Sequence, residues 1–581
     1  MVNPLATLHV RLQAAIADAL GLDFADADPV LRPSAPGQFG DFQANAAMAL
    51  GKRAGRPPRD IAAAIVDAAD LDDLCSLVEV AGPGFINLSL RPETLATATD
   101  ELLDDARLSV ARADPAERVV IDYSAPNVAK EMHVGHIRSK IIGDSIARTL
   151  EFLGHAVVRQ NHFGDWGTQF GMLIEHLVDI GEDQAVRELS VGDLTTFYQD
   201  ARVKFDGDEA FADRSRQRVV VLQAGDQETL ALWRILFDAS KAYTDAVYDR
   251  LGVTLTDDDI AAESSYNDLL DDVATELEST GLARLDEGAL CAFPEGFVGR
   301  DGDALPLMVR KTDGGYGYQA TDLAAIRHRA GTLAADRIIY VVGAPQSQHL
   351  SMVFTVAADA GWTSDVRVEH VSFGSVLGED RKMLATRAGK SVKLSDLLDE
   401  AVERAEATIA EKNPDLDADT RALVARQVGI GAVKYADLSS DRVKDYVFDF
   451  DRMLAFEGNT GPYLQYAHAR IRSIFRRGEG GGGPPVLGPI AITEDAERAL
   501  ALHLLGFGAV VETCAETLQP HRLCVYLFDL AQAFTTFYEA CPVLRAPDEV
   551  TRASRFSLCE LTAQTLRTGL GLLGIEAPDR M

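Results

Sequence analysis

The stretch that decides the fold is RVVIDYSAPNVAKEMHVGHIRSK, residues 118–140. It opens with a β-branched run, 118–123, typical of a buried strand, and a helical pattern follows over 137–153. A second strand-like run, AVVRQ, occupies 156–160. Strand, helix and strand in such close succession form a βαβ unit, because parallel strands need a crossover connection. The segment therefore predicts an α/β fold with a parallel sheet.

A similar pattern returns about two hundred residues later. RIIYVV at 337–342 and VRVEHVSF at 366–373 have the composition of strands, and a helical pattern over 349–360 separates them. The intervening residues 175–300 are acidic and mostly helical in pattern. We therefore predict a doubly wound sheet that is split by a helical insertion.

The two ends of the chain differ from this middle part. Residues 1–112 combine helical patterns with short strand-like runs around a Gly/Pro-rich middle, which predicts a small α+β domain. Strand patterns disappear after about Leu394, and helical ones continue almost to the end. The predicted domains are thus 1–112, an α/β domain at 113–400, and an all-α domain at 401–581.

Composition excludes several classes of protein. Of 581 residues, 47% are hydrophobic and 25% charged, so the chain can fill real cores. We find no uninterrupted apolar run long enough for a bilayer and no basic N-terminal region of a signal peptide. Six cysteines without a CxxC pair exclude a disulfide scaffold and an ordinary zinc ribbon. These features predict a cytoplasmic protein without a membrane partner.

The net charge argues, at face value, against a nucleic-acid partner. With 56 basic and 89 acidic residues, the chain has a formal charge of -33. Net charge, however, describes solubility and long-range fields. A local basic groove can still neutralise phosphates on an acidic protein.

The sharpest chemical motif is HVGH at the predicted strand-to-helix crossover. His133 and His136 lie one turn apart, where backbone N–H groups and the helix dipole favour phosphate. Gly135, between them, lets a flat base lie against the backbone. In open α/β sheets this crossover is the place where ligands bind. The motif predicts a nucleotide site.

These motifs carry a family resemblance. HVGH resembles the HIGH signature of class I aminoacyl-tRNA synthetases, and SAPNVAKEMHVGH (124–136) with NHFGDWGTQFG (161–171) resembles arginyl-tRNA synthetases in particular. The resemblance extends over the whole chain. It implies a Rossmann-like class I catalytic domain with a helical insertion, an N-terminal α+β domain that contacts the tRNA D-loop, and a C-terminal all-α anticodon-binding domain.

The resemblance also implies an arginine site. A planar guanidinium needs carboxylate acceptors and a counter-charge. Asp122, Asp322 and Tyr318 match the family positions for the guanidinium, and Asn127 and Gln346 those for the α-amino and carboxylate end. Taken alone, each could be a strand-end acid or a capping amide, but all five match in register.

The second ATP-binding element of the family is a Lys-Met-Ser-Lys loop, which is degenerate here. In EDRKMLATRAGKSVK (379–393), Lys382 and Met383 match, but Leu384 and Ala385 replace the serine and the second lysine. The resemblance implies that His133, Gly135, His136 and Met383 bind ATP. It implies that His133, His136, Lys130 and Lys382 act in catalysis. We expect Lys130 to supply the missing charge, with Lys390 and Lys393 as alternatives.

The tRNA contacts follow from the same resemblance. In GNTGPYLQYAHAR (458–470), Tyr463, Tyr466 and Arg470 combine aromatic faces with a cation, which suits unstacked bases. Tyrosines at this spacing can equally pack in a helical core. Phe85 and Asn87 match positions that touch the D-loop.

The implied function is ATP-dependent ligation of L-arginine to tRNA(Arg) through arginyl-adenylate, with release of AMP and pyrophosphate. Mg²⁺ would enter with ATP as substrate, no protein-bound metal is expected, and the enzyme would be a monomer. One rival is a class I ligase for another amino acid, but the paired Asp122 and Asp322 argue against a neutral side chain. A second rival is a non-catalytic RNA-binding relative, which would have lost these residues.

Overall fold

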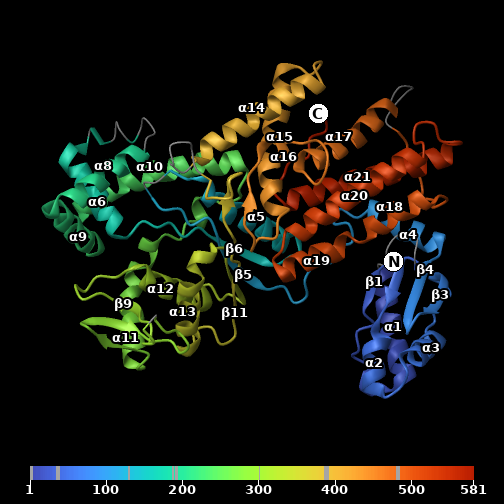
Figure 1. Ribbon diagram of the computed structural model, residues 1–581, viewed down its shortest axis with the longest axis horizontal. Helices are drawn as coiled ribbons and strands as arrows, with labels where there is room; N and C mark the ends of the chain where they lie inside the picture. The colour runs from blue at the N-terminus through green and yellow to red at the C-terminus, as the bar shows by residue number, and fades with distance from the viewer. Residues whose placement is uncertain are drawn as a thin grey trace.

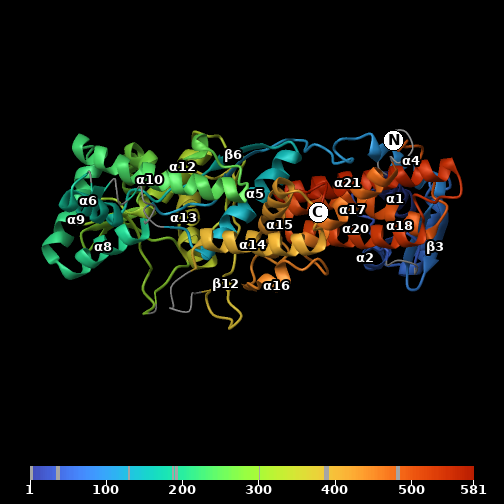
Figure 2. The same cartoon turned by 90° about the horizontal axis from the view of Figure 1, so that it is seen from above.

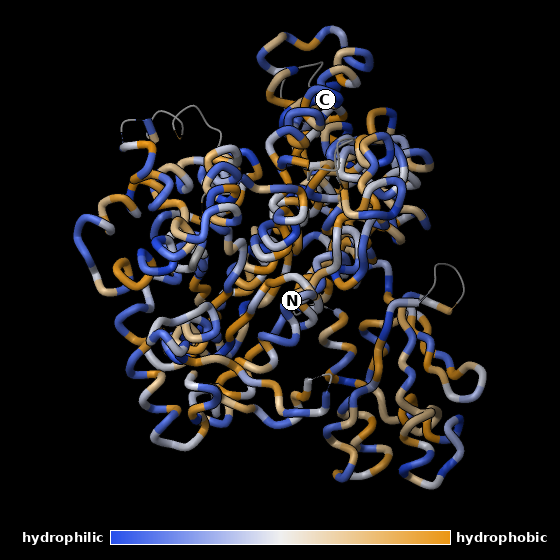
Figure 3. The backbone as a smooth tube through the Cα atoms, turned by 60° about the vertical axis from the view of Figure 1, so that its left-hand side comes forward, coloured by the Kyte–Doolittle hydropathy of each residue, from blue (hydrophilic) through white to orange (hydrophobic). Residues whose placement is uncertain are grey.

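The computed structural model describes residues 4–34, 39–128, 131–182, 184–185, 189, 194–299, 301–384, 392–478 and 485–581. The molecule is elongated. The N-terminal unit and the C-terminal helices lie at one end, and the insertion lies at the other (Figures 1 and 2). Hydrophobic stretches of the chain run through the middle of these units, and many outer loops are hydrophilic (Figure 3).

A four-stranded parallel sheet forms the centre, as the βαβ patterns predicted. Its order is β11-β10-β5-β6, and Asp122 at the end of β5 is aligned with Tyr340 of β10 and Gln160 of β6. Val119, Val120 and Ile121 are fully buried, because helices cover both faces of such a sheet. The strands are β5 (Arg118–Asp122), β6 (Ala156–Gln160), β10 (Arg337–Tyr340) and β11 (Arg367–His370), and the crossover helices are α5 (Ile137–Phe152) and α13 (Ser347–Asp359).

The insertion between β6 and β10 is mainly helical, as predicted, but it also contains a three-stranded antiparallel sheet. Each of these strands has four residues, which is too short for a clear alternation of polar and apolar side chains. The helices are α6 (Thr168–Ile180), α8 (Leu194–Gly207), α9 (Glu209–Gln223), α10 (Gln227–Leu251), α11 (Leu270–Ser279) and α12 (Tyr318–Gly331). The 3₁₀ turns are η3 (Asp257–Asp259) and η4 (Glu263–Leu269), and the strands are β7 (Ala283–Asp286), β8 (Ala289–Ala292) and β9 (Leu307–Arg310).

The N-terminal unit is α+β, as predicted. Its antiparallel sheet has the order β1-β2-β4-β3. It consists of α1 (Pro4–Leu20), η1 (Leu22–Phe24), β1 (Leu31–Pro33), β2 (Phe42–Ala44), α2 (Ala46–Ala54), α3 (Pro58–Ala68), β3 (Cys75–Ala81), β4 (Phe85–Leu90) and α4 (Pro92–Leu103). Arg498 of the C-terminal unit holds this unit in place: its Nε lies 3.0 Å from Asp41 Oδ1 and its Nη2 2.7 Å from the Leu90 carbonyl oxygen.

The C-terminal unit is helical, with one strand that pairs outside it. That strand, β13 (Tyr446–Val447), runs parallel to β12 (Val376–Leu377) of the preceding part of the chain. A strand of two residues leaves no sequence pattern, which is why none was predicted here. The helices are α14 (Leu394–Lys412), α15 (Ala418–Leu438), α16 (Phe450–Met453), α17 (Gly461–Gly478), α18 (Asp495–Leu505), α19 (Phe507–Thr517), α20 (His521–Ala540) and α21 (Glu549–Leu572).

One stretch, Asp495–Thr517, has the length and hydropathy of a membrane span. It consists of two helices, α18 and α19, and half of its apolar window is buried inside the protein. Leu500, Leu504 and Val511 are almost fully buried there. The structure thus uses this stretch as a core of the helical unit.

Candidate active site

The two histidines of HVGH lie together at the start of α5. The His133 backbone N–H donates to His136 Nδ1 at 3.1 Å, the Gly135 N–H donates to His133 Nδ1 at 3.1 Å, and the ring centroids are 3.8 Å apart. A neutral imidazole that accepts at Nδ1 carries its proton on Nε2. Both rings can therefore donate from Nε2 to one anion. A Cβ on residue 135 would lie 2.8 Å from the His133 ring, so glycine leaves room for this position of the ring.

The degenerate loop begins and ends against neighbouring parts of the site. At its start the Gly378 N–H donates to the Lys382 carbonyl oxygen at 2.8 Å, which forms a tight turn with Lys382 and Met383 exposed. At its end the Val134 N–H donates to the Val392 carbonyl oxygen at 3.1 Å. Lys393 Nζ lies 2.7 Å from Glu131 Oε2. The loop thus returns directly onto the histidine turn.

Several predicted positions fall outside the described residues. Lys130, expected to supply the phosphate-stabilising charge, is one of them. Ala385 and Lys390 of the degenerate loop are the others. Their expected roles stay predictions.

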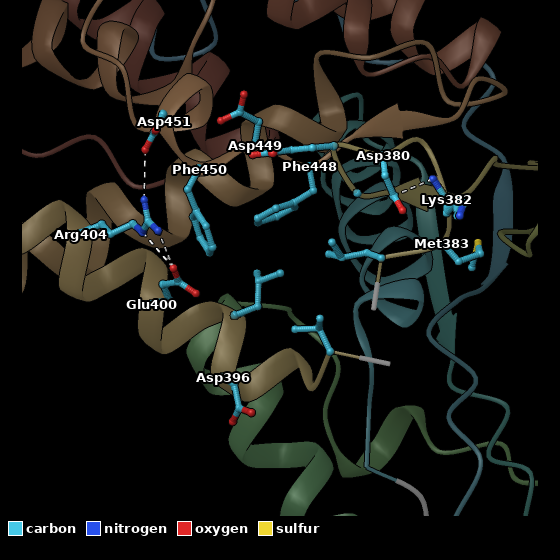
Figure 4. A pocket seen from close by; sticks show the side chains of 15 residues that line it. Asp380, Lys382, Met383, Asp396, Glu400, Arg404, Phe448, Asp449, Phe450 and Asp451 are labelled. Atoms are coloured by element: carbon cyan, nitrogen blue, oxygen red, sulfur yellow. Dashed lines mark hydrogen bonds and ion pairs between the residues drawn. The ribbon is translucent and has the colours of Figure 1, made fainter. Parts of the chain in front are cut away.

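A cavity of about 720 Å³ adjoins the loop (Figure 4). Lys382 and Met383 line one side, and Phe448 and Phe450 lie opposite. Its wall is strongly acidic, because six carboxylates face only two cations. The carboxylates belong to Glu379, Asp380, Asp396, Glu400, Asp449 and Asp451, and the cations to Lys382 and Arg404.

Arg404 in this cavity is already paired. Its Nη2 lies 2.7 Å from Glu400 Oε1, and its Nη1 lies 3.1 Å from Asp451 Oδ1. Such a wall repels a triphosphate. The histidine turn, not this cavity, therefore suits the triphosphate.

A second cavity, of about 540 Å³, contains two residues that the sequence singled out, Asn127 and Tyr318. Asn127, Trp166 and Tyr318 line it, together with Gln169 and Glu263. Asn127 follows β5, whereas Tyr318 begins α12, so the cavity lies between the first half of the sheet and the insertion. The cavity therefore combines Asn127, expected at the α-amino and carboxylate end of arginine, with Tyr318, expected at its guanidinium.

Asp322 lies near this cavity, one turn after Tyr318. His349 Nε2 is 2.6 Å from Asp322 Oδ2, and His162 Nε2 is 3.8 Å from Oδ1. The Tyr318 and His349 ring centroids are 5.0 Å apart. Gln346 is exposed, in the 3₁₀ turn η5 (Ala344–Gln346) just before α13. The structure thus gathers the predicted Tyr318, Asp322 and Gln346 around the start of two helices.

Asp122 has a different environment from the one expected. Its side chain is buried, and Oδ2 lies 2.8 Å from Nη2 of Arg329, which is fully buried in α12. The Arg329 guanidinium also lies over the Tyr340 ring, 5.0 Å from its centroid. A guanidinium of the protein therefore occupies one oxygen of this carboxylate. Sequence reasoning missed Arg329 because nothing in its helical context marks it as buried.

Glu263 is a site residue that the sequence analysis missed. It lines the cavity, and its Oε2 accepts the Trp166 N–H at 3.2 Å. Burial, reinforced by the charges of Asp165 and Asp322, raises the pKa of Glu263 to about 8. Burial also raises the pKa of Asp165 to about 6. In an insertion with so many acids, no local pattern distinguishes Glu263.

The predicted tRNA residues differ in their accessibility. Phe85 is half-buried at the start of β4, and Asn87 is buried, with Oδ1 accepting from Gln43 Nε2 at 2.9 Å. On α17, Tyr463 is half-buried and its ring centroid lies 5.6 Å from that of Phe528. Tyr466 on the same helix is exposed.

Arg470 completes the predicted patch on α17. Its guanidinium lies 4.7 Å from the Tyr538 ring centroid, so a cation and an aromatic face are already stacked there. Tyr466, Arg470 and Tyr538 therefore offer aromatic and cationic surface, whereas Tyr463 contributes mainly to packing. In the described parts of the chain, no three His, Cys, Asp or Glu side chains are grouped to hold a metal ion.

Comparison with known proteins decides the family. The class I (R) tRNA-synthetase catalytic domain matches residues 98–450, the DALR anticodon-binding domain 464–581, and the arginyl-tRNA synthetase N-terminal domain 6–90. The arginine–tRNA ligase of Thermobifida fusca is 59% identical over 581 residues and covers 100% of each chain. The chain belongs to the arginyl-tRNA synthetases. The predicted resemblance is thus confirmed.

Further relatives agree with this assignment. The arginine–tRNA ligase of Frankia casuarinae is 53% identical, over 99% of this synthetase and 98% of the relative. The crystal structure of the Plasmodium falciparum arginyl-tRNA synthetase superimposes with a TM-score of 0.82 at 29% identity, over 100% of both chains. The Thermus thermophilus enzyme gives 0.80 at 29%, over 99% and 100%. The predicted fold class and the predicted activity, ATP-dependent charging of tRNA(Arg) with arginine, are confirmed.

Proposed function

We propose that this synthetase forms arginyl-adenylate between the histidine turn and the start of α12 and α13. The arginine carboxylate attacks the α-phosphate of Mg²⁺–ATP, and pyrophosphate leaves. The terminal ribose of tRNA(Arg) then attacks the carbonyl carbon through its 2′-OH, and AMP leaves. The supporting observation is the position of both parts at the carboxyl ends of β5 and β10, where open parallel sheets bind ligands.

The phosphate end of the site works by placement and charge. His133 and His136 donate from Nε2 to the phosphates and stabilise the negative charge of the transition state. Gly135 lets the adenine lie against the turn, and Met383 borders the nucleotide. Lys130 and Lys382 add positive charge, and no covalent intermediate with the enzyme is needed.

The arginine end of the site recognises a cation. Asp322 and Glu263 accept from the guanidinium, and Tyr318 borders it. Asn127 and Gln346 hold the α-amino and carboxylate end. Asp122 contributes indirectly, because its carboxylate is paired with Arg329 behind the site. We therefore assign the substrate's counter-charge to Asp322 and Glu263.

The tRNA contacts the C-terminal helices and the N-terminal unit, which lie at the same end of the elongated enzyme. The anticodon end stacks on Tyr466 and Arg470, and the D-loop reaches the sheet of the N-terminal unit at Phe85, on the same strand as the buried Asn87. We take the domains as 1–112, 113–400 and 401–581. We expect a cytoplasmic monomer, with no membrane partner, whose activation step needs bound tRNA.

One assay tests the substrate and the tRNA requirement together. The purified enzyme is incubated with ATP, Mg²⁺ and each of the twenty amino acids, with and without unfractionated tRNA, and pyrophosphate exchange and aminoacylation are measured. Exchange with arginine, and only when tRNA is present, is expected. Strong exchange with arginine and ATP alone would refute the tRNA requirement, and charging with another amino acid would refute the specificity.

A further inference from the structure

Arg138, two residues after His136, connects the histidine turn with distant parts of the chain. Its side chain is 1% exposed. Its Nε lies 3.2 Å from Asp437 Oδ1 in the last turn of α15, and its Nη1 donates to the Lys444 carbonyl oxygen at 3.0 Å. A fully buried arginine that contacts residues much later in the chain fixes the relative position of the segments that it joins.

Arg138 also contacts β13, which supports β12, the strand that leads into the degenerate loop. The Arg138 guanidinium lies 5.3 Å from the ring centroid of Tyr446, the first residue of β13. β13 pairs with β12, and β12 runs directly into the loop that contains Lys382 and Met383. The Gly374 N–H donates to the Arg442 carbonyl oxygen at 3.0 Å and adds a second link between these segments.

The same region of α5 is fixed to the sheet by the neighbouring residue. Ser139 Oγ donates to the Val341 carbonyl oxygen at 2.7 Å and accepts the Ser124 N–H at 2.9 Å. Ser139 thus sets the first turn of α5 against β5 and β10. Of these two residues, only Arg138 contacts the segment that supports the degenerate loop.

We propose that Arg138 is a positioning residue for the nucleotide. Through Asp437 and the Lys444 carbonyl it holds the histidine turn and the Lys382 loop at the separation that ATP needs. It does not touch the substrate. The cavity with Asn127, Tyr318 and Glu263 has no residue in this set of contacts. Loss of the Arg138 contacts therefore changes nucleotide use and leaves arginine binding as it was.

The test uses Arg138→Lys and Asp437→Asn, with Glu497→Gln as the matched control. Glu497 forms an equally buried ion pair with Arg555, at 2.8 Å, but inside the helical unit and away from the histidine turn. For each full-length variant, exchange in the presence of tRNA is measured against ATP and against arginine, per titrated active site. Melting temperatures are recorded alongside.

A rise in the ATP KM of about tenfold, with the arginine KM within about twofold of wild type, is expected for both Arg138→Lys and Asp437→Asn. Glu497→Gln should lower the melting temperature and leave both KM values unchanged. ATP and arginine KM values that rise together, or a control that behaves like the two variants, would overturn the proposal.

The double variant shows whether Arg138 and Asp437 affect ATP use together or independently. If Arg138 and Asp437 act as one unit, the double variant loses no more than the worse single variant. Additive losses in ATP use would overturn the proposal. Should Asp437→Asn fail to fold, Arg138→Lys tests the proposal alone, because lysine keeps the charge but not the geometry of the guanidinium. A raised ATP KM with an unchanged arginine KM is again the expected result.

Discussion

Arg329 Nη2 lies 2.8 Å from Asp122 Oδ2, in a buried ion pair at the end of the central strand β5. The pair places a guanidinium of the protein at one of the two carboxylates expected to bind the substrate. We propose that Asp322, which is only half-buried, and Glu263, which lines the cavity, bind the substrate instead. The two aspartates should therefore respond differently to substitution.

Asp322→Asn should damage arginine use, and Asp122→Asn should mainly damage stability. Removing the counter-charge at Asp322 raises the arginine KM, or lowers kcat/KM for arginine, with the ATP KM little changed. Removing the charge of Asp122 leaves Arg329 buried without its partner, which costs about 3–5 kcal/mol. Steady-state pyrophosphate exchange measures the effect on arginine use, and thermal melts measure the effect on stability. Unchanged arginine kinetics in Asp322→Asn would remove that residue from the pocket.

Arginine binding should release a proton from Glu263. With a pKa of about 8, the Glu263 carboxyl is mostly protonated at pH 7, and a bound guanidinium favours its anion. The arginine KM should therefore fall as pH rises from about 6.5 to 8, at most about tenfold per unit for one proton. Calorimetry in buffers of different ionisation enthalpy counts the proton. Glu263→Gln should remove this release, and a variant that kept it would assign the proton to another group.

Lys130→Ala should lower kcat for activation with little change in arginine KM. The interaction with the phosphates grows as charge develops, so its loss costs about 2–4 kcal/mol in the transition state. Lys382→Ala, in the exposed loop, should have a smaller effect, and Lys52→Ala, exposed on the N-terminal unit, is the neutral control. Near-normal exchange in Lys130→Met, together with loss of exchange in Lys382→Ala, would transfer the role to the loop.

Substitutions on α17 should separate tRNA binding from packing. Tyr466→Ala and Arg470→Ala should raise the KM for tRNA, because stacking on one base contributes about 1–3 kcal/mol. Tyr463→Ala, whose ring packs against Phe528, should instead lower the melting temperature. Filter binding of tRNA(Arg) and thermal melts provide the two measurements. A tRNA affinity that falls only in Tyr463→Ala would reverse the assignment.

The sequence predicted the elements that are formed by an unbroken run of residues with a distinctive composition. The fully apolar run Val119–Ile121 marked a buried parallel strand, and the HVGH turn marked the start of the crossover helix that follows it. The match to the family loop singled out Lys382 and Met383, whose roles stay predictions. These features depend on local order along the chain, which a single sequence displays.

What the sequence could not predict depends on pairing between distant residues. Arg329 and Glu263 are ordinary charged residues in helical stretches until the fold buries one and places the other in a cavity. The two-residue strands β12 and β13 carry no periodicity and exist only because the segments meet. Asp122 was placed at the correct end of its strand, but its partner could not be read from the sequence.

The split of the central sheet has a consequence for the synthesis of this protein. The Arg118 N–H at the start of β5 donates to Asp336 Oδ2, 218 positions later in the chain. At about 5–20 residues per second, a ribosome needs roughly 10 to 40 s to deliver that partner. During this interval the edge of β5 that pairs with β10 exposes unpaired backbone N–H and C=O groups, which are a template for aggregation. Nascent chains should thus be most prone to aggregate, and most dependent on chaperones, while the insertion is being translated.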